Sequence, residues 1–312
     1  MTTGQGTLAL VGDIGATTAR LALARDGMPV PGTAARLATA DHASAEALLA
    51  AYLATQRAAP RRACLAVAGP VRGSGVWMRN RGWQIEAEAL ATALGLQHVH
   101  LMNDLQAQGR ALDRLSEAAL DPLLAGRPEP GVARLVIGLG TGVNCAPVHR
   151  VPGSSGLFVP ATESGAAALP VHDAESLALA ERLRAEAGGA TVEEALSGRG
   201  LTRLWRFAGG HGRLAPPDVL TEAAAGENHA AEAVALYARL LGHAARDMAL
   251  AHLALGGVWL SGGLARAVAP HLRRNGFEAA FRADPLTAAI PVQVIADDAA
   301  AVLGCAEVAR EG

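Results

Sequence analysis

Apolar residues along this chain of 312 residues fall into two spacings, which predict an alternation of strands and helices. Apolar runs of roughly four to eight residues, bounded by glycine, proline or polar residues, are typical of buried strands. Longer segments with apolar positions three and four apart are typical of amphipathic helices. This alternation predicts an α/β fold. Strands are expected at 62–68, 98–102, 258–260 and 291–296, and helices at 43–57, 86–96, 105–120, 173–187, 191–196, 201–207, 228–255 and 299–310.

The first apolar segment, LALVGDIGATTARLALA from Leu8 to Ala24, predicts two strands joined by a turn that contains Gly12, Asp13 and Gly15. A glycine turn presents backbone N–H groups on its concave side and lets a phosphate approach closely, because glycine has no Cβ. Asp13 offers a carboxylate to a hydrated metal ion. An ordinary hairpin with a glycine turn fits the same pattern equally well.

A similar pattern returns in the middle of the chain. Residues 134–146, RLVIGLGTGVNCA, again read as strand, glycine turn and strand, and 137–141 match 11–15 loosely. Two such hairpins suit a duplicated fold that holds a ligand between its halves. Residues 120–131 contain three prolines and two glycines, so we expect the boundary between two lobes there.

Composition and the common nucleotide motifs exclude several classes of protein. The chain has a formal net charge of −2, so we expect no nucleic-acid partner and no membrane partner. It lacks the G-x-x-x-x-G-K-[ST] motif of P-loop NTPases. The segment from Gly138 lacks the third glycine and the following helix of a Rossmann fingerprint. The N-terminus does not resemble a signal peptide. Three scattered cysteines in apolar segments predict buried reduced thiols in a cytoplasmic protein: Cys64, Cys145 and Cys305.

Polar residues at the end of one predicted strand are candidates for catalysis. Asn103 and Asp104 follow the strand at 98–102 and precede a helix, so they lie at the carboxyl edge of the sheet, where α/β proteins bind ligands. Asp104 fits either the N-cap of that helix or a general base that takes the proton of a substrate hydroxyl. With Asn80, Glu163 and Glu193 these residues would form a site rich in acceptors and amides, as polyols require.

Eight segments, in this order and spacing, resemble the bacterial glucokinase family of the actin-like, hexokinase and sugar-kinase superfamily. The resemblance covers nearly the whole chain. It implies an α/β, two-lobed actin-like ATPase fold, related to ribonuclease H, with a cleft between a small lobe, 1–114 plus 297–312, and a large lobe, 115–296. The segments are DIGATTARLAL, AGPVRGSGVWMRNRGW, LMNDLQA, GLGTGVN, TESGA, EEALSGRGL, GGVWLSGGLA and IADDAAAVLGCA.

The same resemblance implies ATP-dependent phosphorylation of glucose at its 6-hydroxyl, with Mg²⁺, in a homodimer. Asp104 matches the general base of the family, and Asp13 the acid near Mg²⁺. The matching sugar-binding residues are Asn80, Asn103, Asp104, Glu163 and Glu193. The matching residues for the phosphates and the adenosine are Gly12, Asp13, Gly15, Ala16, Thr17, Gly140, Thr141, Gly142, Gly262 and Gly263.

Two departures from the family pattern bear on activity. Ala16 and Thr18 stand where the family has glycine and asparagine, and an alanine held at positive φ would cost about 1–2 kcal/mol. Ala166 stands where the family has a histidine that contacts the sugar. One lost hydrogen bond would weaken glucose binding roughly tenfold. We expect an active kinase, and the alternatives are a sugar-binding or regulatory protein with little or no turnover, or a kinase for another hexose or an amino-hexose.

Overall fold

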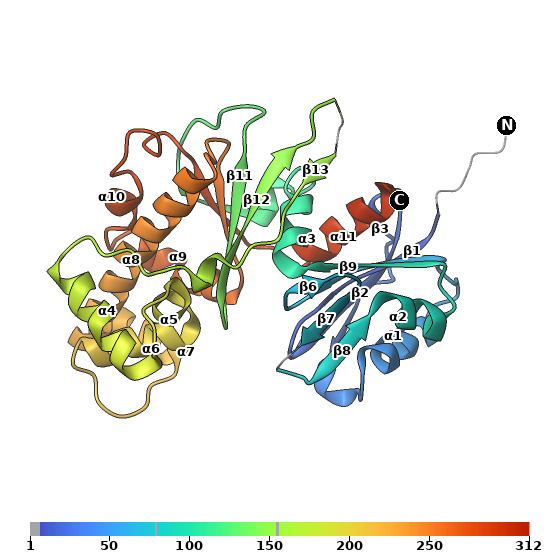
Figure 1. Ribbon diagram of the computed structural model, residues 1–312, viewed down its shortest axis with the longest axis horizontal. Helices are drawn as coiled ribbons and strands as arrows, with labels where there is room; N and C mark the ends of the chain where they lie inside the picture. The colour runs from blue at the N-terminus through green and yellow to red at the C-terminus, as the bar shows by residue number, and fades with distance from the viewer. Residues whose placement is uncertain (1–6, 79, 154–155, 312) are drawn as a thin grey trace. The chain divides into compact units, whose positions relative to one another are not determined.

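The computed structural model describes residues 7–78, 80–153 and 156–311 (Figure 1). The chain divides into two compact units, Met1–Leu115 with Asp297–Gly312, and Ser116–Ala296. Each unit is built on its own mixed sheet. The first unit therefore combines the N-terminal part of the chain with its C-terminal segment.

The first unit contains a sheet in the order β3-β2-β1-β5-β9, with β4 added to β2. β2 is antiparallel to β1, whereas β5 and β9 run parallel to it, so β1, β5 and β9 all end at one edge. Register pairs Ile14 with Val67 and Val67 with Asn103 at that edge. The strands are β1 (Ala9–Ile14), β2 (Thr18–Arg25), β3 (Met28–Pro29), β4 (Ala35–Ala38), β5 (Arg62–Val67) and β9 (His98–Asn103).

Helices cover both faces of this sheet because alternate residues of its buried strands point to opposite faces. Leu10 and Leu65 belong to the core on one face, whereas Val11 and Cys64 belong to the core on the other. Figure 1 shows α1 and α2 on the first face, and α3 and α11 on the second. The helices are α1 (Ala45–Ala54), α2 (Ala87–Leu94), α3 (Asp104–Ala111) and α11 (Ala300–Glu311), with a small sheet of β6 (Val71–Arg72), β7 (Gly75–Met78) and β8 (Trp83–Glu86).

The second unit repeats the central strand arrangement of the first. Its sheet has the order β13-β12-β11-β14-β15-β10. The β11–β12 hairpin is antiparallel, and β14 and β15 follow in parallel, as β5 and β9 follow β1. This shared order agrees with the internal sequence match. The strands are β10 (Leu120–Leu124), β11 (Arg134–Leu139), β12 (Val143–Arg150), β13 (Leu157–Phe158), β14 (Val258–Ser261) and β15 (Val292–Ile295).

The long helix α8 lies at the centre of the core of the second unit. Thirteen of its residues are buried, and its buried leucines and alanines pack with residues of neighbouring helices and strands. None of the helices within the described ranges is both long and apolar enough for a membrane span. The helices of this unit are α4 (Ala174–Ala187), α5 (Val192–Leu196), α6 (Gly198–Phe207), α7 (Pro216–Ala225), α8 (Asn228–Ala251), α9 (Gly263–Leu272) and α10 (Phe277–Phe281).

The structure corrects two expectations from the sequence. The proline-rich stretch 120–131 is not the boundary between units, which falls at residues 115 and 116. Its first part is β10, an edge strand on β15, and the register shifts just after Pro122. An edge strand tolerates proline because one side of its backbone needs no partner strand. The helix expected at 105–120 ends at Ala111, and a 3₁₀ turn and β10 follow.

Candidate active site

The first glycine turn closes the β1–β2 hairpin. Gly12 lies in β1, where a Cβ would overlap Leu21 Cδ2, so a larger residue would have to displace that buried side chain. Gly15 N–H donates to the Thr18 carbonyl at 3.0 Å, which makes a tight turn. Among the described non-glycine residues only Asp26 and Leu253 have positive φ. Ala16 is therefore unstrained, and the energetic cost considered for an alanine at this position does not arise.

Thr39, which the sequence analysis does not single out, stabilises this turn. Thr39 is fully buried; its hydroxyl donates to the Ala16 carbonyl at 2.7 Å, and its N–H donates to the Thr17 carbonyl at 3.1 Å. Its own carbonyl accepts from Arg81 at 2.7 Å. The turn is thus held without the amide side chain that is absent at position 18.

Asp13 lies in a group of charged residues within the first unit. Arg20, its partner across the hairpin, approaches it at 3.6 Å and also pairs with Asp298 at 3.1 Å. Burial, followed by the negative charge of Asp104, raises the pKa of Asp13 to about 7, although Arg20 opposes the rise. A carboxylate in this setting is stabilised by a cation.

Neutralising Asp13 should increase stability at alkaline pH. The folded-state pKa of about 7 lies above the ordinary 3.8, so this group costs no stability below about pH 4 and costs progressively more as the pH rises to 7. The difference corresponds to about 4 kcal/mol at most. We expect thermal unfolding of D13N and wild type to coincide near pH 3.5 and D13N to melt higher at pH 8. D26N, at an exposed turn, is the control, and equal midpoints at pH 8 would contradict the assignment.

The Asn103–Asp104 pair begins α3 at the carboxyl edge of the sheet. Asn103, rather than Asp104, is the N-cap: its Oδ1 accepts from Leu105 N–H at 3.0 Å, and Gln106 completes a capping box. Its Nδ2 also donates to the Gly69 carbonyl at 3.1 Å. Asp104 is the first helical residue, and its Oδ1 accepts from Leu105 N–H at 3.0 Å. Because the cap is provided by Asn103, the structure does not assign that role to Asp104.

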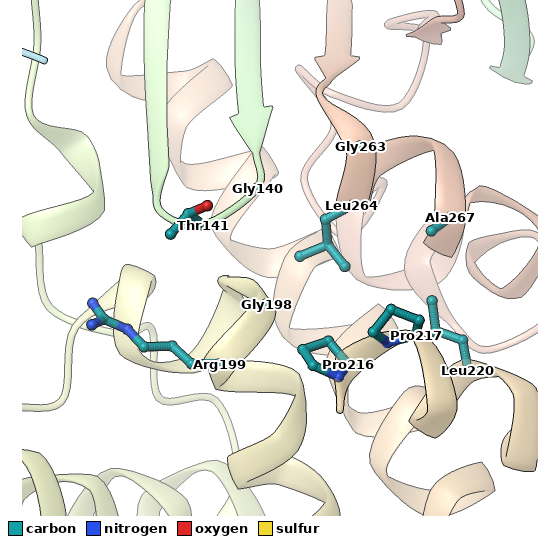
Figure 2. Close-up of a pocket in the computed structure, with 10 residues that line it drawn as sticks. All are labelled: Gly140, Thr141, Gly198, Arg199, Pro216, Pro217, Leu220, Gly263, Leu264 and Ala267. Carbon is teal, nitrogen blue, oxygen red and sulfur yellow. The ribbon is translucent and has the colours of Figure 1, made fainter. Parts of the chain in front are cut away.

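The second glycine turn borders a pocket of about 400 Å³ in the second unit. Figure 2 shows apolar side chains on one side of the pocket and Thr141 and Arg199 on the other. Such a division suits a ligand with a flat apolar part and a polar or charged part. The lining residues are Gly140, Thr141, Gly198, Arg199, Pro216, Pro217, Leu220, Gly263, Leu264 and Ala267.

Two helices begin in the lining of this pocket. Gly198 and Gly263 are the first residues of α6 and α9, where backbone N–H groups and the helix dipole favour negative charge. Arg199 is the one charged residue in the lining. Gly262, just before α9, has φ +99°, and a Cβ there would overlap the Leu139 carbonyl oxygen. Glycine at 262 therefore lets α9 begin directly against β11.

Glu193 and the turn after Glu163 lie against the second glycine turn. Glu193 Oε2 accepts from Val143 N–H at 3.2 Å, and its Oε1 pairs with Arg199 at 2.8 Å. Gly165 packs so closely on β12 that a Cβ would overlap the Val143 carbonyl oxygen, and that Cβ would lie 3.4 Å from Glu193 Cβ. Glu163 is exposed just before this turn. The structure thus brings Glu193 to the predicted nucleotide turn.

The remaining predicted residues occupy less informative positions. Asn80 is exposed in the turn between β7 and β8, and Ala166 is exposed in the turn after Glu163. Both lie at solvent-accessible turns, where a small ligand could reach them.

Several residues that shape the site are not among those predicted from the sequence, although some of them have a recognisable sequence pattern. Arg20 could have been inferred, because the predicted hairpin places it opposite Asp13. Pro216 and Pro217 had a signal as a proline pair that begins a helix. Thr39 and Asp298 reach the first turn and its charged group from distant parts of the chain, and no local pattern indicates that contact.

The mixed α/β fold of the two units is that of the actin-like sugar kinases, and comparison with known proteins identifies the family. The sequence model of the Glucokinase family matches residues 10–312. The chain is 34% identical to a glucokinase of Mesorhizobium japonicum over 96% of this chain and 91% of that protein. The chain belongs to the glucokinase family.

Solved structures agree with this assignment. The crystal structure of a glucokinase from an Antarctic psychrotroph superposes with a TM-score of 0.89 at 26% identity, over 99% of this chain and 100% of the other. A ROK family glucokinase from Streptomyces griseus, solved with glucose and AMPPNP, has the same fold, with a TM-score of 0.67 at 18% identity over 98% of this chain and 100% of the other.

Proposed function

We propose that this protein transfers the γ-phosphoryl group of ATP to the 6-hydroxyl of glucose, with Asp104 as general base. The observation that carries the proposal is the anion-favouring pocket at the second glycine turn in a chain of the glucokinase family. Its apolar wall suits adenine, and its helix N-termini suit phosphates. The Streptomyces griseus relative was solved with the corresponding pair of ligands, glucose and AMPPNP.

In the proposed reaction the sugar oxygen O6 bonds to the γ-phosphorus while the bond from that phosphorus to the bridging oxygen of ADP breaks. Asp104 takes the proton of the 6-hydroxyl. The proposal assigns backbone N–H groups of the two glycine turns to the phosphates, whose charge they would stabilise. These turns contain Gly12, Asp13, Gly15, Ala16 and Thr17, and Gly140, Thr141 and Gly142, whereas Gly262 and Gly263 are assigned to the adenosine.

The proposal assigns the sugar to a set of acceptors and amides. Glu163 and Glu193 can each accept from sugar hydroxyls. The Asn103 amide already bonds to Gly69 and Leu105, so it orients the edge that carries Asp104 and retains one N–H for the sugar. Asn80, in its exposed turn, completes the assigned set.

Asp13 fits a magnesium ion. Mg²⁺ is usually held by one or two carboxylates together with substrate phosphates and water. Burial raises the pKa of Asp13 most, and the negative charges of Asp104 and Asp298 add to the rise, so a bound cation would stabilise the ionised carboxylate. The described residues contain no cluster of three or more metal-ligating side chains, which is compatible with an ion shared with ATP. Bound there, the ion would neutralise phosphate charge.

A coupled assay with ATP, MgCl₂ and a panel of hexoses and amino-hexoses tests the function. We expect ADP release that depends on sugar, with glucose among the best substrates and glucose 6-phosphate as its product by NMR. The unstrained Ala16 and the brace from Thr39 favour turnover over a purely regulatory role. Sugar binding by calorimetry without ADP release from any sugar would instead establish the sugar-binding regulator.

Two further properties belong to the proposal. The three free cysteines are all buried, which together with the use of ATP supports a cytoplasmic location. A homodimer is proposed from the family, and light scattering of the purified protein would give twice the mass of 31.7 kDa.

A further inference from the structure

Arg199 belongs to two sites at once. Its side chain lines the pocket proposed for the nucleotide, beside Thr141 of the second glycine turn (Figure 2). Its guanidinium is also paired with Glu193 Oε1 at 2.8 Å, and Glu193 is a proposed ligand of the sugar. One cation therefore lies where a phosphate would attract it and is bonded to a carboxylate that a sugar would need.

Each oxygen of Glu193 accepts one hydrogen bond in this structure. Oε2 accepts from Val143 N–H at 3.2 Å, immediately after the glycine turn, and Oε1 accepts from Arg199. While Arg199 is paired with Oε1, its positive charge weakens Oε1 as an acceptor for a sugar hydroxyl. The negative charge of Glu193 likewise weakens the attraction of the guanidinium for a phosphate. A phosphate that binds Arg199 weakens its bond to Oε1 and so favours the sugar. A sugar hydroxyl that binds Oε1 likewise favours the phosphate.

We propose that the Arg199–Glu193 pair couples the two substrates, so that nucleotide in the pocket strengthens sugar binding and sugar strengthens nucleotide binding. The inference rests on the proposed function and adds a positioning role for Arg199. By linkage the two enhancements are equal in size. Arg199 touches the nucleotide and acts on the sugar only through Glu193.

Arg199 can break its bond to Glu193 without leaving the pocket, because a second carboxylate lies beside it. Arg199 also approaches Glu194 Oε1 at 3.4 Å, and Glu194 is itself ion-paired to Arg203. Glu194 therefore keeps the guanidinium at the pocket when Glu193 is withdrawn. The side chains of Arg199 and Glu193 are 56% and 35% exposed, and exchange at an exposed pair is easy because such pairs are weak. We expect a coupling of about two- to fivefold in affinity.

Calorimetry on the full chain measures this coupling directly. Glucose is titrated with and without saturating AMPPNP and MgCl₂ into wild type, R199Q, R199K and R206A. Arg206 lies on the same helix but outside the pocket, so R206A is the matched control. We expect AMPPNP to tighten glucose binding about two- to fivefold in wild type and R206A, partly in R199K and not at all in R199Q.

A second prediction separates coupling from damage. In R199Q without nucleotide, glucose should bind as tightly as in wild type or more tightly, because Oε1 is no longer held by a cation, while AMPPNP binds more weakly. Thermal melts check that each variant is folded, and R199K tests the same point if R199Q is not. An enhancement that persists in R199Q, or is absent in wild type that binds both ligands, overturns the inference. Wild type that binds neither ligand overturns the proposed function itself.

Discussion

Replacing Asp104 by asparagine should lower kcat for glucose phosphorylation by about 10²- to 10⁴-fold, the usual contribution of a general base. Asparagine has nearly the same shape and can keep the bond from Leu105 N–H, so α3 should begin as before. It cannot take a proton. The KM for glucose should change much less than kcat, because the hydroxyl can still bond to the amide. Steady-state kinetics with ATP and glucose measure both values.

D104N also has a consequence that does not depend on turnover. The negative charge of Asp104 adds to the effect of burial in raising the pKa of Asp13, so removing that charge should shift the pKa of Asp13 downward. The loss of stability between pH 4 and 7 should then be smaller in D104N than in wild type. D113N, at an exposed position after the same helix, is the control for both measurements. A kcat within threefold of wild type would contradict the assignment of Asp104 as base.

The pattern of apolar residues predicts correctly those strands and helices whose periodicity extends over many consecutive residues. The β1–β2 and β11–β12 hairpins, the β9 strand and the α8 helix occur close to where apolar periodicity predicts them. Their side chains alternate or repeat over enough residues to define a buried face. Short elements with few apolar residues, such as β6 to β8 and α7, carry too little periodicity and were missed.

The site was predictable where its residues follow strands, and not where it depends on packing. Asn103 and Asp104 were located by the end of β9, but only the structure shows that Asn103 makes the cap. The sign of φ at Ala16 depends on how the whole turn closes. Thr39 meets that turn through the tertiary fold, since its partner Ala16 is 23 residues away in sequence.

The position of Asp104 depends on the close crossing of two helices. Gly304 of α11 packs on the backbone of α3, and a Cβ there would overlap the Ala107 carbonyl oxygen and lie 2.6 Å from its carbon. Ion pairs extend the contact, including Arg114 with Glu307 at 2.9 Å. A backbone carbonyl within a helix cannot rotate away as a side chain could. A larger residue at 304 must therefore separate the two helices.

G304A should consequently impair stability and catalysis together. We expect unfolding to require about 1–3 kcal/mol less, the usual cost of overpacking, although alanine favours the helix intrinsically by roughly 1 kcal/mol. We also expect kcat to fall at least tenfold at temperatures where the protein remains folded, because α3 moves with Asp104 at its start and a misplacement of about 1 Å can cost 10²-fold.

Thermal melts and kinetics well below the melting temperature separate these effects of G304A. G189A is the matched control: its added Cβ would meet only Thr191 Cγ2 at 3.8 Å, an ordinary contact, so both stability and kcat should stay near wild type. A stable G304A with normal kcat would show that α11 can move without carrying α3. A destabilised variant with normal kcat at low temperature would show that the crossing supports the fold but does not position Asp104.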